Sequence, residues 1–234
     1  MSIKLKTLIF VFFIFSILKQ LNAHELKKNE INSIIKNFIL ENPQVIEETL
    51  QNLNLKRSKN NFKLAMTDLK KVPNPKLKRA NADVIIYEFF DYNCGYCKSV
   101  MQNIFNIYKK DKKVEIVFVE YPILSNSSLS AAVTSLATRN QNKYFQFHRK
   151  LMKHSGKIDD KLLLTLAKEL KIDTNKLKDD YSNGKLMLII NKNREIANRL
   201  NLRGTPAFII GNKIYPGAMS EKDIEKAIAI ERKK

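Results

Sequence analysis

Hydrophobic residues near the start of the chain recur at the three- and four-residue spacing of amphipathic helices. The first set ends just before Asn42-Pro43, a pair typical of an N-cap followed by proline at the first helical position. A second set follows and continues toward Met66. The two sets are Ile31, Ile34, Ile35, Phe38 and Ile39, then Val45, Ile46, Leu50 and Leu53. We therefore predict a helical N-terminal extension over residues 24–69, whose apolar faces can pack on this chain or on a partner chain.

A different pattern, a nearly continuous run of apolar and β-branched residues, occupies Val84–Phe90 and Val114–Glu120. Each run is typical of a strand buried on both faces of a sheet, and Glu88 is the charged exception within the first. Between the two runs the apolar residues return to a helical spacing: Met101, Ile104, Phe105 and Tyr108. This β-α-β order predicts an α/β domain with parallel pairing and a right-handed crossover.

The remaining pattern predicts a helical insertion and a closing hairpin. From residue 127 to about residue 202 the apolar spacing is helical throughout. Strand signals return at residues 207–210 and 213–215, joined by the hairpin-type dipeptide Gly211-Asn212. Ser220 with Asp223 then forms a capping box for a last helix.

Domain boundaries follow from these elements. Residues 70–81 contain two prolines and five basic residues without an apolar period, which we interpret as a linker. Residues 82–234 then form one domain that includes the insertion.

Residues 1–23 have the three parts of a secretory signal peptide. Lys4 and Lys6 form a basic start, an apolar run of 11 residues covers Leu8–Leu18, and a polar stretch ends in Ala23. The apolar run is shorter than the roughly 20 residues of a membrane-spanning helix. We expect cleavage after Ala23 and a periplasmic mature protein, in a compartment where disulfides form and persist.

Composition and charge exclude few function classes. A chain of 234 residues has enough core to fold without a disulfide framework or a metal, so its two cysteines are available for chemistry. The net charge of +19 favours anionic surfaces. Lysine is nevertheless spread through the chain, without a groove-reading motif, and we expect no nucleic-acid partner.

The two cysteines form Cys94-Gly95-Tyr96-Cys97 at the junction of a predicted buried strand and a predicted helix. Backbone N–H groups at a helix N-terminus stabilise an anion, so Cys94 should have a lowered pKa and act as the attacking sulfur. Cys97, one turn into the helix, can resolve the mixed disulfide that Cys94 forms with a substrate.

Other uses of the cysteine pair fit less well. Zinc requires four ligands, and His148 lies far beyond the roughly 12–15 residues that separate ligand pairs in a finger module. Lys98 stands where a c-type haem site would need histidine. A structural disulfide that closes so small a loop contributes little stability. We therefore favour redox chemistry and predict no metal and no cofactor.

Two motifs together resemble the DsbA-like branch of the thioredoxin superfamily. The first is YEFFDYNCGYCK, from Tyr87 to Lys98, and the second is RGTPAF, from Arg203 to Phe208. The resemblance extends from about Val84 to Ile228. It implies a thioredoxin fold with an inserted helical subdomain and the activity of a thiol–disulfide oxidoreductase.

The resemblance also implies roles for individual residues beside the redox-active pair Cys94–Cys97. Pro206 matches the proline that is cis in this superfamily and lies against the disulfide. Thr205 matches the residue whose backbone pairs with bound polypeptide and whose side chain faces the cysteines. Glu88 matches a buried carboxylate that accepts and returns the proton of Cys97.

The first functional expectation is oxidation of thiol-containing exported proteins, with a membrane protein as redox partner. Two features are instead similar to the periplasmic isomerases: Gly95-Tyr96 supplies no histidine between the cysteines, and Thr205 replaces the apolar residue of the oxidase. A disulfide isomerase or reductase, assembled as a homo-oligomer through residues 24–69, is therefore the alternative. A non-catalytic envelope or surface protein on a thioredoxin scaffold is the alternative of another class.

Overall fold

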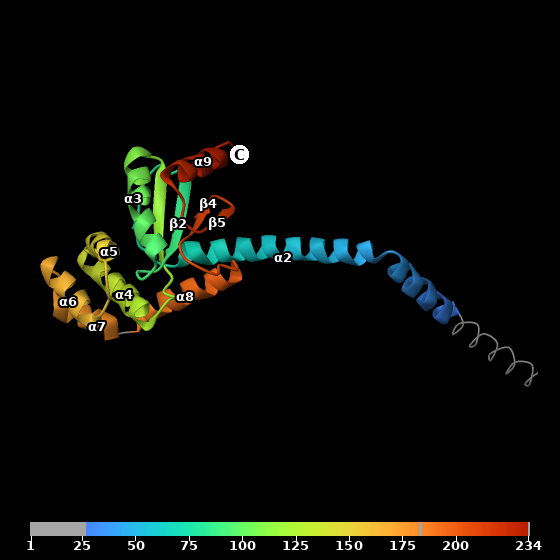
Figure 1. Ribbon diagram of the computed structural model, residues 1–234, viewed down its shortest axis with the longest axis horizontal. Helices are drawn as coiled ribbons and strands as arrows, with labels where there is room; N and C mark the ends of the chain where they lie inside the picture. Colours follow the sequence, from blue (N-terminus) through green and yellow to red (C-terminus); the bar gives the residue numbers. More distant parts are fainter. Residues whose placement is uncertain (1–26, 183, 234) are drawn as a thin grey trace, which may run out of the picture. The chain divides into compact units, whose positions relative to one another are not determined.

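The computed structural model describes residues 27–182 and 184–233. The predicted signal peptide lies outside these residues. By its contacts the chain divides into two compact units, Met1–Lys59 and Asn60–Lys234. Helix α2, Pro43–Lys71, contributes to both units. Figure 1 labels α2 and colours the chain by its position in the sequence.

The described part of the first unit is helical, as the apolar spacing predicts. A helix covers residues 27–41, and α2 begins at Pro43. The Asn42 side chain donates its Nδ2 proton back to the Phe38 carbonyl at 2.8 Å, so it closes the first helix instead of capping the second. The apolar residues of both helices are largely exposed within this chain.

The segment after residue 59 differs from the predicted extension and linker. Ala65 and Leu69 of α2 are buried in a hydrophobic cluster with the sheet, so the last turns of α2 belong to the domain core. Residues Lys76–Leu77 form strand β1, and the Pro75 carbonyl accepts a hydrogen bond from the Phe118 amide at 2.8 Å. Prolines are compatible with such a strand because it lies at an edge of the sheet.

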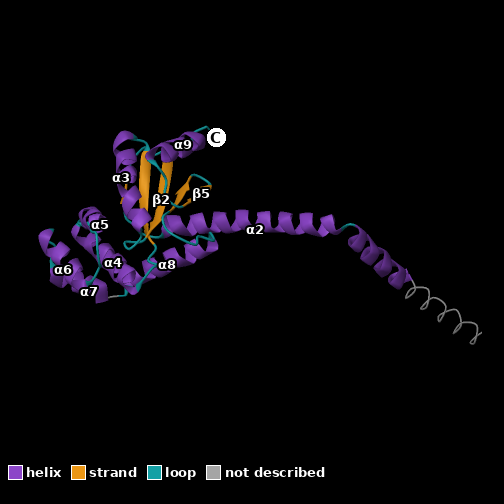
Figure 2. Cartoon of the chain, in the orientation of Figure 1, coloured by secondary structure: helices purple, strands orange, loops and turns teal. Residues whose placement is uncertain are grey.

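The sheet has five strands in the order β1-β3-β2-β4-β5. Figure 2 shows strands in orange, with β2 and β5 labelled. Strands β2, Val84–Phe90, and β3, Val114–Glu120, pair in parallel with Val84 opposite Val114 and Phe90 opposite Glu120. Strand β4, Ala207–Ile210, pairs antiparallel with β2, and β5, Lys213–Pro216, with β4. The predicted strands are confirmed, and β2 lies at the centre of the sheet.

Helices cover the sheet through two hydrophobic clusters. The larger cluster joins one face to α3, Gly95–Lys110, to α9, Glu221–Glu231, and to the insertion helices. The smaller cluster joins the other face to the end of α2 and to α8, Lys185–Arg199. The insertion helices are α4 (Asn126–Ala137), η1 (Thr138–Gln141), α5 (Tyr144–Lys153), α6 (Asp160–Glu169) and α7 (Thr174–Ser182). A helical insertion between β3 and β4 is thus present as predicted.

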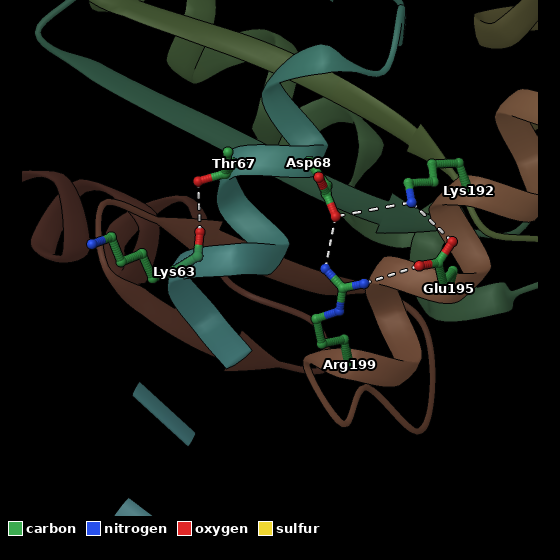
Figure 3. Close-up of polar contacts among 6 residues, drawn as sticks. All are labelled: Lys63, Thr67, Asp68, Lys192, Glu195 and Arg199. Carbon is green, nitrogen blue, oxygen red and sulfur yellow. Dashed lines mark hydrogen bonds and ion pairs between the residues drawn. The ribbon is translucent and has the colours of Figure 1, made fainter. Parts of the chain in front are cut away.

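Ion pairs fix the end of α2 beside α8 (Figure 3). Asp68 lies 2.7 Å from Arg199 and 3.9 Å from Lys192, and Arg199 also lies 2.9 Å from Glu195. These side chains are partly exposed, and because solvent screens such pairs they contribute little to stability. The burial of Ala65 and Leu69 therefore stabilises this packing more than the charges do.

Candidate active site

The cysteine motif lies where β2 passes into α3. Cys94 is the N-cap residue, with extended backbone angles of φ −80° and ψ 114°, and its Sγ accepts a hydrogen bond from the Cys97 amide at 3.4 Å. The predicted helix thus begins directly after Cys94. Its sulfur takes the place that a serine or aspartate oxygen occupies at other helix starts.

The two thiols are free and have different surroundings. Hydrogen bonding from the Cys97 thiol, assisted by the Thr205 hydroxyl and by backbone amides, lowers the pKa of Cys94 to about 5. Cys97 is fully buried, and desolvation raises its pKa above that of an ordinary thiol. At neutral pH Cys94 is therefore a thiolate and Cys97 a thiol, which is the asymmetry that the motif predicts.

Glu88 lies in the middle of β2 with only 2% of its surface exposed. Desolvation, followed by the charge of Cys94, raises the pKa of Glu88 to about 8. The charge of Glu88 in turn contributes to the raised pKa of Cys97. Glu88 is thus a buried acid coupled to both sulfurs, and it does not point to water.

The second motif meets the first through Thr205. The Cys94 thiol lies 3.1 Å from the Thr205 carbonyl oxygen, which would accept its proton in the thiol form. The Thr205 hydroxyl has no partner of good hydrogen-bond geometry among the described residues, yet it lies near enough to lower the pKa of Cys94. The Thr205–Pro206 peptide bond is cis, as the resemblance implies, and the Pro206 carbonyl accepts a bond from the Gly217 amide at 2.8 Å.

Sequence reasoning missed the residues that hold the loops beside the cysteines. One oxygen of the buried Asp91 accepts a hydrogen bond from the Asn93 amide at 2.8 Å. The other accepts from the amides of Ile123 and Leu124 at 2.8 Å and 3.0 Å. An aspartate directly after a strand is a recognised turn signal, so the first contact was within reach of the sequence. The second contact joins loops 32 residues apart.

The two histidines of the described residues, His148 and His154, lie outside any group of metal-ligating side chains. His148 is buried, and its Nδ1 lies 3.0 Å from the Tyr92 hydroxyl. His154 contacts the Lys157 carbonyl near the surface. Within residues 27–182 and 184–233, no three side chains of the metal-ligating types gather in one place.

Comparison with known proteins agrees with the fold and the site. The thioredoxin family model matches residues 78–229. Disulfide bond formation protein D of Bacillus subtilis is 26% identical over 171 residues, which are 68% of this chain and 77% of that protein.

Two solved structures are also similar. A thioredoxin-like oxidoreductase from Silicibacter pomeroyi is 34% identical with a TM-score of 0.69, over 71% of this chain and 97% of that one. The thiol-disulfide exchange protein α-DsbA2 from Wolbachia pipientis is 29% identical with a TM-score of 0.69, over 74% and 95%. The chain belongs to the thioredoxin family and is a thiol–disulfide oxidoreductase of the DsbA type.

Proposed function

We propose that this protein forms disulfide bonds in exported proteins through the Cys94–Cys97 pair. The observation that carries the proposal is the difference between the two sulfurs. Cys94 is held as a thiolate at the start of α3, while Cys97 is buried behind it beside a carboxyl group with a pKa of about 8. A good leaving sulfur at Cys94 makes the enzyme's disulfide a ready electron acceptor.

The reaction begins with the oxidised protein. A substrate thiolate attacks Cys94 Sγ, the Cys94–Cys97 bond breaks, and Cys97 leaves as a thiolate that takes the proton of Glu88. A second substrate thiolate then attacks the substrate sulfur of the mixed disulfide and releases Cys94 as a thiolate. The substrate has gained a disulfide and the enzyme has become a dithiol, so two electrons have moved to the enzyme.

Renewal of the disulfide uses the same groups in reverse. Cys94 attacks one sulfur of a disulfide in a membrane redox partner, and the partner's other sulfur leaves as a thiolate, so Cys94 loses its negative charge in the mixed disulfide. Because that charge contributes to the raised pKa of Glu88, the Glu88 pKa then falls. Glu88 releases its proton to solvent, and the resulting carboxylate accepts the Cys97 proton. Cys97 can then attack Cys94 and release the partner as a dithiol. Glu88 thus serves as acid in one half-reaction and as base in the other.

The direction of catalysis is tested with ribonuclease. We expect the oxidised protein to restore activity to reduced ribonuclease faster than the reduced protein restores scrambled ribonuclease. Rescue of the scrambled form alone would establish isomerase activity and contradict the oxidase proposal.

A disulfide isomerase is the second candidate, and the exposed apolar helices of the first unit favour it. Ile34 is 67% exposed and Phe38 51% exposed within this chain, and such surfaces are usually covered by another chain. We expect light scattering to give an oligomer for the mature protein and a monomer after removal of residues 24–59. The deletion stops there, not at residue 69, because Ala65 and Leu69 belong to the domain core. Equal masses per chain in both cases would contradict assembly through this region.

We further propose that the protein acts in the periplasm after cleavage of residues 1–23. A similar structure from Salmonella enterica serovar Typhimurium, at 25% identity, is described as a periplasmic thioredoxin-like protein. Among the described residues, the helices are too short or too polar to cross a membrane. Mass determination of the protein from a periplasmic fraction tests the cleavage after Ala23.

A further inference from the structure

Asp91, Tyr92 and Asn93, the three residues before Cys94, each make their own polar contacts. Asp91 binds the loop that follows β3, as described above. The side-chain Nδ2 of Asn93 lies 2.9–3.1 Å from the hydroxyls of Ser125, Ser127 and Ser128 at the start of α4. Tyr92, between them, turns inward to the core. Each residue of the segment Asp91–Asn93, which leads into the N-cap residue Cys94, is therefore fixed by hydrogen bonds.

Tyr92 is held by the carboxyl group of Glu120, at the end of β3. The Tyr92 hydroxyl donates to Glu120 Oε1 at 3.1 Å, and the Tyr144 hydroxyl of α5 donates to the same oxygen at 2.8 Å. Because the single Tyr92 proton goes to Glu120, the 3.0 Å contact with His148 Nδ1 places the imidazole proton on Nδ1. Tyr92, Glu120, Tyr144 and His148 are all buried, so water does not compete for these hydrogen bonds.

The proposed reaction leaves these four groups without a role. Burying a carboxyl group and an imidazole in an apolar core costs free energy that well-packed hydrophobic side chains would avoid. Glu120 Oε2, His148 Nε2 and the Ser135 hydroxyl are moreover buried without a hydrogen-bond partner among the described residues. The cluster thus maintains a specific contact at some cost to stability, and that contact lies two residues from Cys94.

We propose that Tyr92 and Glu120 are positioning residues of the dithiol reaction, which hold the Asp91–Asn93 segment so that Cys94 Sγ faces the first amides of α3. The inference rests on the proposed role of Cys94 as the attacking thiolate. The Sγ accepts from the Cys97 amide at 3.4 Å. Because a hydrogen bond weakens as it loses its alignment, a shift of the segment before Cys94 would weaken this contact.

Charge around the cluster is consistent with a neutral Glu120. Desolvation raises the pKa of Glu120 well above its ordinary value, and the charges of Asp91 and Glu88 act in the same direction. Desolvation lowers the pKa of His148 to about 3, so the imidazole is also neutral. Near neutral pH, Glu120 therefore acts on Cys94 through hydrogen bonds and packing, and an amide at this position should replace it.

Two matched variants separate positioning from general stability. Tyr92→Phe and Tyr144→Phe each remove one buried hydroxyl from the same Glu120 oxygen, but only Tyr92 is adjacent in sequence to the active site. The probe is the rate of iodoacetamide alkylation against pH, which reports Cys94 because Cys97 is fully buried. We expect both variants to have lower thermal midpoints. Only Tyr92→Phe should raise the Cys94 pKa, by about one unit, which slows alkylation about tenfold below both pKa values.

Glu120 is tested in the same assay by a conservative and a disruptive change. Glu120→Gln keeps an oxygen acceptor for both tyrosines and should leave the Cys94 pKa at its native value. Glu120→Ala removes the acceptor and should shift the pKa as Tyr92→Phe does. An unchanged pKa in Tyr92→Phe, or an equal shift in Tyr144→Phe, would overturn the inference. An ordinary thiol pKa in the unmodified protein would instead overturn the proposed function, and this inference with it.

Discussion

Cys97→Ser is expected to accumulate mixed disulfides with substrate proteins, whereas Cys94→Ser forms none. Cys94 alone carries the lowered pKa and approaches the surface, so it forms the first covalent bond. Without the Cys97 sulfur the mixed disulfide has no internal route to resolution. Turnover in both variants should fall on the order of a thousandfold or more, as is usual when a covalent nucleophile is removed. Non-reducing electrophoresis with mass spectrometry of trapped species distinguishes the two.

Each serine variant serves as the control for the other, because the substitutions are equal in size and three residues apart. Similar thermal midpoints would show that differences in trapping reflect chemistry. A protein whose function is purely structural predicts that neither variant changes any exchange reaction. Trapping by Cys94→Ser would show that Cys97 is the attacking sulfur and would contradict the assignment made from their pKa values.

Glu88→Gln is expected to become several kcal/mol more stable than the native dithiol protein at alkaline pH. The pKa of Glu88 is raised from 4.5 in the unfolded chain to about 8 in the folded one. Its contribution is therefore fully present below pH 4.5 and is lost as pH rises through 8. The shift corresponds to a loss of roughly 5 kcal/mol across that range. Glutamine has no proton to lose and avoids this loss.

Denaturant unfolding at about pH 5 and about pH 9, under reducing conditions, measures the effect. Cys94 has a lowered pKa and shifts stability with pH in the opposite sense, but it is present in both proteins and cancels in the comparison. Glu115→Gln is the matched control, since Glu115 also lies on the sheet but faces Lys76 at 3.8 Å. It should be no more stable than the native protein at either pH. Parallel pH profiles for native and Glu88→Gln proteins would show that Glu88 is not buried as described.

Local patterns predicted the elements around the active site well. Val84–Phe90 and Val114–Glu120 have the predicted bounds because nearly continuous apolar runs are typical of strands that are buried on both faces. The prediction of a linker over residues 70–81 was wrong, because Lys76–Leu77 form strand β1. A strand of two residues is too short to show an apolar period in the sequence. The prediction of an extension over residues 24–69 reached too far along the chain, because Ala65 and Leu69 belong to the domain core. The exposed turns and the core-packed turns of α2 have the same helical spacing, so the sequence did not separate them.

The site was predictable only where its residues are close in sequence or match the family motifs. The setting of Cys94 and Cys97 follows from a strand and a helix start within a few residues. The contact of Cys94 with Thr205 joins residues 111 apart, and only the resemblance indicated it. Tyr92 lies within the first motif, but nothing in that motif indicated its buried contacts. Glu120 gave no signal, because a glutamate at a strand end is ordinarily solvated. It is buried here because α5 of the insertion packs over it.

The unequal burial of the two sulfurs also bears on oxidative damage. Cys94 is 6% exposed and Cys97 is fully buried, so a peroxide meets a single sulfur. That sulfur becomes a sulfenic acid, and the neighbouring Cys97 thiol condenses with it, releasing water and forming the Cys94–Cys97 disulfide before further oxidation. In the proposed oxidase reaction, this disulfide is the form that accepts electrons from the substrates. An oxidant that inactivates a protein with an isolated reactive cysteine should therefore convert this protein to its disulfide form.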